Sequence, residues 1–271
     1  MNKYSSFFTL LSIVWVLTSC GISYNIEGSS DISGLDSRMM YIKTMKNNEL
    51  KDIDSTEVVH GKFGFSGNTD SVRIAYIVVG DANSLPIVLE SGDINVKINK
   101  SRVEWGGTPL NDKLYRFVKT LDSLDVMKED LDHQYNLAFM DGEDMNEVIP
   151  KLSRQYQQIN MSIDTLVTQS IEENFDNILG PGIFMLITQQ TQRYPEMSPW
   201  IVQIMSKATP SFKEDPYVKW YLQQAQYIQN VQNGLENSPA QETATQPEAT
   251  PPTPNELAAP ADSAADTTAR K

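Results

Sequence analysis

The chain has 271 residues, a formal net charge of −13, a pI near 4.6 and a single cysteine. Because an acidic protein repels nucleic acid, the charge argues against nucleic acid as a partner. One cysteine cannot form an internal disulfide, and thiol redox work usually needs two. The composition therefore favours one large or two small globular domains without thiol chemistry of their own.

Residues 1–19 have the pattern of a secretory signal peptide. Lys3 precedes an apolar run over 7–17, which is shorter than the roughly 20 residues that cross a bilayer. Residues 17–20 read Leu-Thr-Ser-Cys and resemble the lipobox of bacterial lipoproteins. In that family the chain is cut before the cysteine, whose thiol carries lipid. The resemblance implies a membrane anchor at Cys20; the alternative is an ordinary signal peptide followed by a chance cysteine.

The residues after Cys20 bear on which side of the membrane the protein faces. Surface lipoproteins of Bacteroidota often carry an acidic cluster directly after the cysteine. In this chain the first acid is Glu27. We therefore expect an outer-membrane protein that faces the periplasm, with surface exposure as the alternative.

Residues 20–106 are predicted to form a β-rich domain, because short β-branched runs alternate with turn residues. His60-Gly61 and Ser91-Gly92-Asp93 each suit a tight hairpin turn. The pattern indicates a small antiparallel β-sandwich or an open barrel. The expected strands lie at 39–42, 58–59, 72–79, 86–89 and 94–98.

Residues 107–233 are predicted to be helical. Thr108 and Pro109 suit a helix start, and apolar residues then follow at helical spacing from Leu110 to Tyr135. A second apolar stripe over 148–175 should pair with the first as an antiparallel hairpin. The expected shorter helices cover 182–193, a stretch from Pro199, and 216–233. The expected fold class is therefore α+β.

Residues 234–271 form a tail rich in Pro, Ala, Thr and Glu, without aromatic residues. Such a segment cannot bury enough apolar surface to offset its chain entropy, so we expect disorder. Two Asp-Ser/Thr motifs in this tail are typical of O-glycan attachment sites in Bacteroidota. They predict glycosylation of Ser263 and Thr267.

Three motifs in the first half resemble domain-of-unknown-function family 4369. Residues 54–67 read DSTEVVHGKFGFSG, residues 86–94 read PIVLESGDI, and residues 107–112 read GTPLND. They follow the family's order. The family occurs on lipoproteins of Bacteroidota, commonly before a thioredoxin-like module with a Cys-x-x-Cys pair. Here the tail begins at residue 234 instead, so the resemblance implies no redox activity and transfers no catalytic residue.

Few residues suit catalysis or ligand binding. His60 is expected in a turn and His133 on a solvated helix position. The acidic stretch 141–147 lacks the ligand spacing of a calcium loop and is expected to favour the N-terminus of the next helix. Trp105 could stack on a sugar, although packing at the junction of the two halves is the preferred interpretation. We therefore expect no metal, no cofactor and no catalytic cluster.

Three functions follow as hypotheses. The preferred one is a non-enzymatic, lipid-anchored envelope protein that binds a partner protein through its sheet or its helical hairpin. The second is an accessory to a separate thioredoxin-like thiol-disulfide system. The third is a glycan-binding module at the cell surface.

Overall fold

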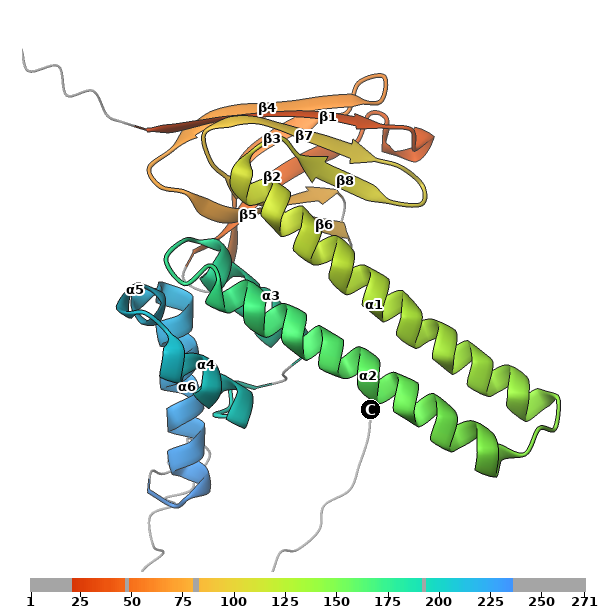
Figure 1. Ribbon diagram of the computed structural model, residues 1–271. Coiled ribbons are helices and arrows are strands. Elements are labelled where there is room, and N and C mark those ends of the chain that lie inside the picture. The colour runs from red at the N-terminus through yellow and green to blue at the C-terminus, as the bar shows by residue number, and fades with distance from the viewer. Residues whose placement is uncertain (1–20, 47–48, 80–82, 192–193, 236–271) are drawn as a thin grey trace, which may run out of the picture.

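The computed structural model describes residues 21–46, 49–79, 83–191 and 194–235. Within these ranges, strands occupy the first half and helices the second (Figure 1). The change falls between Gly106, the last residue of the final strand, and Pro109, the first residue of the long helix. The predicted α+β class is confirmed.

Eight strands form two four-stranded sheets among the described residues. Their bounds are β1 Ile22–Ser30, β2 Met39–Lys46, β3 Glu49–Glu57, β4 Lys62–Thr69, β5 Arg73–Val79, β6 Asn83–Leu89, β7 Gly92–Ile98 and β8 Val103–Gly106. The first sheet has the order β4-β1-β7-β8, and the second has the order β3-β2-β5-β6. Neither sheet closes into a barrel, so the arrangement is an open sandwich. β1 and β7 run parallel, whereas the other pairs of described strands are antiparallel.

The two predicted turns have different outcomes. His60 and Gly61 have φ angles of 51° and 69°, and Val59 and Lys62 form a bridge across them, so the tight turn is confirmed. The strands that it joins, β3 and β4, lie in different sheets, so they do not pair as the expected hairpin. The prediction of a hairpin at Ser91-Gly92-Asp93 is wrong. There the chain leaves β6 in one sheet and enters β7 in the other. A turn residue signals a change of direction, but the sheet that receives the next strand depends on tertiary packing.

β3 was not predicted, and it replaces the strand expected at 58–59. Val58 is buried in the link to β4, after the strand has ended at Glu57. β3 lies at the edge of its sheet, and most of its side chains are exposed. Its pairing with β2 shifts register around Ile53, as at a β-bulge. An exposed, bulged edge strand has no alternation of apolar and polar residues from which it could be predicted.

Six α-helices follow in the part of the chain that the structure describes. Their bounds are α1 Pro109–Met140, α2 Met145–Glu172, α3 Leu179–Thr191, α4 Pro199–Lys207, α5 Pro210–Glu214 and α6 Pro216–Gln232. Local capping sets several of these starts: the side chains of Asp144, Ser198 and Asp215 accept hydrogen bonds from backbone N–H groups of α2, α4 and α6. No helix in the described part of the chain is long and apolar enough to cross a membrane.

A single hydrophobic core joins the sandwich to the helices. It includes Ile26 and Ile77 from the two sheets, Leu114 from α1 and Phe184 from α3. Gly182 allows α3 to lie directly on β5, because a Cβ atom at this position would be 2.6 Å from Cγ1 of Ile74. The β-rich and helical segments therefore fold as one body.

The distal parts of α1 and α2 extend beyond this body as an antiparallel hairpin (Figure 1). We call residues 124–162 the arm. A separate, small hydrophobic cluster holds it together, with Leu131, Leu152 and Ile159 as its buried members. The predicted hairpin is confirmed, and Asp141 to Asp144 form the link at its tip.

Candidate functional site

The motif residues near the end of the sandwich form a structural joint with α1. Oε1 of Glu90 accepts hydrogen bonds from the backbone N–H groups of Leu110, at 2.8 Å, and Asn111, at 3.1 Å. The carboxylate thereby satisfies donors in the first turn of α1, where negative charge is also favoured by the helix dipole. The Thr108 side chain, which was expected to cap the helix, makes no such bond to the backbone.

Asn111 completes this joint from inside the core. Its Oδ1 accepts from the backbone N–H of Val88 at 2.9 Å, and its Nδ2 donates to the carbonyl of Val88 at 2.8 Å. The same Nδ2 donates to the hydroxyl of Thr108 at 2.8 Å. Asn111 is fully buried, so these bonds satisfy the free edge of β6 where water cannot. Two of the recognised motifs thus serve to fix α1 against the sandwich.

Trp105 lies at the same junction. Its side chain is buried, and its ring packs edge-on against that of Tyr115 in α1, with ring centroids 5.0 Å apart. Packing at the junction is therefore confirmed for Trp105, and a buried ring offers no face to a sugar. Trp200 and Trp220 lie partly buried against the main core.

A cleft of about 580 Å³ opens between the sandwich and the helices. β2 and the start of β5 form one wall, whereas α3 and the start of α6 form the other. Most of the wall is apolar, as is usual for sites that hold small molecules. The apolar side chains are Met45, Val72, Ile74, Ile178, Pro181, Met185, Pro216 and Trp220.

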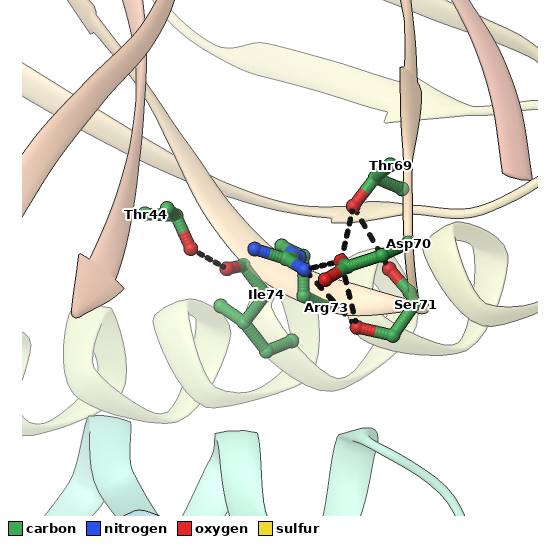
Figure 2. A network of polar contacts seen from close by, with 6 residues as sticks. All are labelled: Thr44, Thr69, Asp70, Ser71, Arg73 and Ile74. Carbon is green, nitrogen blue, oxygen red and sulfur yellow. Dashed lines mark hydrogen bonds and ion pairs between the residues drawn. The ribbon is translucent and has the colours of Figure 1, made fainter. Parts of the chain in front are cut away.

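Arg73 supplies the positive charge of the cleft (Figure 2). Its Nη2 forms an ion pair with Asp70 and donates to the hydroxyl of Ser71 at 3.1 Å. The Nε atom is buried and has no hydrogen-bond partner among the described residues. Beside it, the buried hydroxyl of Thr44 donates to the carbonyl of Ile74 at 3.3 Å and is thereby satisfied. Arg73 therefore retains an unsatisfied donor, which a ligand could reach only if the Arg73 side chain moved.

Asp215 supplies a negative charge on the opposite wall. Its Oδ1 accepts from the backbone N–H groups of Tyr217, at 2.9 Å, and Val218, at 3.2 Å. Burial raises the pKa of Asp215, although these two hydrogen bonds act in the opposite direction. No ion pair joins Asp215 to Arg73 among the described residues. Arg73 and Asp215 could therefore each bind a different group of a ligand.

Two tyrosines extend this desolvated region into the protein. Burial raises the pKa of Tyr217, whose hydroxyl lies 3.0 Å from that of Thr188. Burial, with a contribution from Tyr217, raises the pKa of Tyr76 to about 12. Tyr76 is buried, so the region behind the cleft is shielded from solvent. A charge–charge contact made there is stronger than it would be at an open surface.

The sequence-predicted candidates do not gather at this cleft. His60 occupies the turn between β3 and β4, and His133 is exposed on the arm. In the acidic stretch, Asp144 caps α2, as expected for a link that favours the next helix. The described residues contain no group of three His, Cys, Asp or Glu side chains placed to hold a metal ion.

Other predicted sites fall beyond the ranges in which the structure describes the chain. Cys20, the expected lipid attachment site, lies outside them. Ser263 and Thr267, the expected glycosylation sites, also lie outside, with nearly all of the predicted tail. These expectations stay predictions.

Arg73 and Asp215 were not recognised as site residues from the sequence. Asp215 directly precedes the helix expected at 216–233, and Arg73 falls within the strand expected at 72–79. The one local signal was an arginine between the apolar residues Val72 and Ile74, at a strand end. Nothing in the sequence indicates that residues so far apart in the chain line one cleft.

Comparison with known families identifies the N-terminal domain. Residues 24–114 match the family described as Domain of unknown function (DUF4369). The predicted resemblance is confirmed, and the match includes the sandwich together with the first turns of α1, where the joint lies. No curated protein matches the chain.

Proposed function

We propose that this chain, whose N-terminal part is a DUF4369 domain, is a non-enzymatic binding protein of the bacterial cell envelope, anchored by lipid at Cys20. The observation that carries the binding function is the largely apolar cleft with an unsatisfied arginine donor. The expected ligand has an apolar part for the walls and an anionic group for Arg73.

Arg73 suits such an anion because its present partner is easily replaced. The side chain of Asp70 is 84% exposed, whereas that of Arg73 is 32% exposed. An ion pair at such an exposed position contributes roughly 0–1 kcal/mol, so a ligand carboxylate or sulfonate can take its place at low cost. Once Asp70 is displaced, the Arg73 side chain can turn, and its planar guanidinium can bind that group through two parallel hydrogen bonds.

A pair of dyes tests this ligand class. Anilinonaphthalene sulfonate carries an apolar ring system and an anion, whereas N-phenylnaphthylamine has similar rings without charge. We expect Arg73→Gln to weaken sulfonate binding about tenfold, which corresponds to roughly 1.4 kcal/mol, and to leave binding of the neutral dye unchanged. Energy transfer from Trp220, which lines the cleft, should report the bound dye and weaken in Trp220→Phe, in which Trp105 and Trp200 remain as donors.

The outcome depends on these variants remaining folded, which circular dichroism would establish. Arg73→Lys keeps the charge but loses the planar fork, so it should show an intermediate affinity. Equal binding of the sulfonate dye to the wild type and to folded Arg73→Gln would contradict the proposed site.

The proposed anchor at Cys20 is supported by the lipobox-like sequence, and it would fix which end of the sandwich lies near the membrane. β1 begins at Ile22, so Gly21 alone separates the proposed lipid on Cys20 from the sandwich. With so short a tether, the start of β1 would lie close to the membrane. Labelling of cells with a radioactive fatty acid tests the anchor, because Cys20→Ser should lose the label. An unchanged label in that variant would contradict lipidation.

The same cells can separate the preferred function from the two alternatives. Chemical cross-linking followed by co-purification should recover an envelope protein other than a disulfide reductase. Recovery of a disulfide reductase as the main partner would favour the thioredoxin-accessory alternative. Binding to a glycan panel by the protein lacking residues 236–271 would favour the glycan-binding alternative.

The tail carries a separate proposal, glycosylation of Ser263 and Thr267. Its support is the two Asp-Ser/Thr motifs in a stretch without aromatic residues. Mass spectrometry of tail peptides from the native organism should find added sugar on one of these residues. Fully unmodified peptides would contradict this proposal and leave the anchor and the cleft unaffected.

A further inference from the structure

The arm is thinly packed compared with the helices of the body. Its hydrophobic cluster has three buried members, and each of these side chains is between 7% and 9% exposed. Each helix of the arm packs against only one other helix, so a large part of its surface remains in contact with water. A third helix is the usual means by which such a pair acquires a fuller core.

One face of the arm has the shape to receive a third helix. An open groove of about 590 Å³ runs between α1 and α2, with Leu124, Met127 and Leu131 on one side and Ile159 on the other. Met127 and the neighbouring Val126 are 52% and 55% exposed, although both are apolar. From Leu124 to Gln134 the α1 side of the groove is about 15 Å long, which is close to three turns of helix.

The charge of the arm restricts what can occupy this groove. Residues 124–162 contain eight acidic and three basic side chains, so their formal charge is −5. Asp130 lines the groove itself, and Glu129 precedes it. A second copy of the arm would bring like charges together, and an anionic lipid surface would be repelled. The tail of this chain is also acidic, since residues 236–271 contain six acids and two bases.

We propose that the arm binds a basic amphipathic helix of a partner protein, which lies in this groove as the third helix of a bundle. The partner's apolar residues, spaced three and four apart, would contact Met127 and its apolar neighbours. Its lysines and arginines would face the carboxylates along the rim. This surface is distinct from the cleft at Arg73, and neither proposal depends on the other.

The arm is also placed to reach such a partner. In Figure 1 the tip of the arm, where α1 is linked to α2, lies far from the start of β1. If Cys20 is anchored, the arm extends away from the site of attachment. A partner helix could then be bound without contact between its own protein and the anchored end.

The experiment uses the chain from Gly21 onwards and a synthetic helix with leucines three and four residues apart on one face and lysines on the other. A scrambled peptide of the same composition lacks an apolar face, and a leucine–glutamate peptide reverses the charge. We expect the leucine–lysine helix to bind at least tenfold more tightly than either. Binding by the scrambled peptide with equal affinity would overturn the proposal, because it would show attraction by charge alone.

Met127→Asp provides the decisive variant, because it removes apolar surface from the groove while adding negative charge. Attraction by charge alone predicts equal or tighter binding of the basic helix. The groove predicts at least a tenfold loss. Val202→Asp makes a similar change on α4, where Val202 is 51% exposed, and should bind like the wild type. Wild-type affinity in Met127→Asp would overturn the proposal, and circular dichroism would verify that both variants are folded.

Discussion

Side chains in the core of the body are contacted by several helices and strands, whereas those in the arm are contacted by one facing helix. In the body, Phe184 contacts the rings of Phe212 and Tyr221, with centroids 5.7 and 5.1 Å away, and it is fully buried. In the arm, Leu131 has the partners of only one facing helix and keeps 7% of its exposure. The same apolar spacing therefore produces a complete core where several elements converge and an incomplete one where two helices stand alone.

This difference separates two roles. The body can hold a defined cleft because its walls are fixed by a continuous core. The arm retains apolar surface that a partner could still cover. The stabilities of variants in the body and in the arm can therefore test this difference. The largest effect is expected for a substitution in the core of the body.

Phe184→Ala should lower the free energy of unfolding of the whole protein by about 3–5 kcal/mol, because it leaves a cavity among packed aromatic rings. Urea denaturation followed by circular dichroism would measure this loss. A loss below about 1 kcal/mol would show that the body's core can collapse around the gap, and the contrast with the arm would then be smaller than proposed.

Asn111→Leu should destabilise the joint by about 2–4 kcal/mol, because it leaves the buried N–H and carbonyl groups of Val88 without partners. Asn136→Leu is the matched control, since Asn136 is exposed on the same helix and its replacement should change stability by no more than about 0.5 kcal/mol. Similar unfolding midpoints for the two variants would contradict the role of Asn111.

Leu131→Ala should cost about 2 kcal/mol, near the lower end for such a substitution because water already reaches the site. The effect should be confined to the arm. Hydrogen exchange should become faster over residues 124–162 and remain unchanged in the sheets. Leu114→Ala, on the same helix but fully buried in the body, should accelerate exchange in the sheets as well. Identical exchange patterns in the two variants would show that arm and body unfold together.

Tyr76 should make the body sensitive to alkaline pH. Its pKa is raised to about 12 from a usual value near 10, so the folded state retains the proton over that interval while the unfolded state releases it. Stability should be unaffected below pH 10 and then fall by about 1–2 kcal/mol as the pH rises towards 12. Tyr76→Phe should remove this part of the decline, measured as urea midpoints at several pH values. If the stability of Tyr76→Phe fell as steeply above pH 10 as that of the wild type, the proposed effect of Tyr76 would be contradicted.

Local signals predicted much of the helical half. Ser198-Pro199 and Asp215-Pro216 do begin helices, because a capping side chain and a proline act through neighbouring backbone atoms. α5 was missed because it spans only the five residues Pro210–Glu214 and is too short for a periodic pattern. The strands were harder, since β3 is exposed and carries no alternation.

The recognised motifs were correctly placed, but their role required the structure. Glu90 and Asn111 belong to different motifs and meet only because α1 packs across the end of β6. The sequence could show that such residues recur in a family. It could not show that one satisfies a helix terminus and the other a strand edge.

The α+β class, the tight turn at His60-Gly61, the paired helices and the match to DUF4369 could all be predicted from the sequence. These features depend on neighbouring residues or on periodic burial. Tertiary structure alone decided which sheet receives each strand, and it brought Arg73 and Asp215 to one cleft. It also left the groove at Met127 uncovered. Burial depends on which distant elements pack together, and no local pattern specifies that.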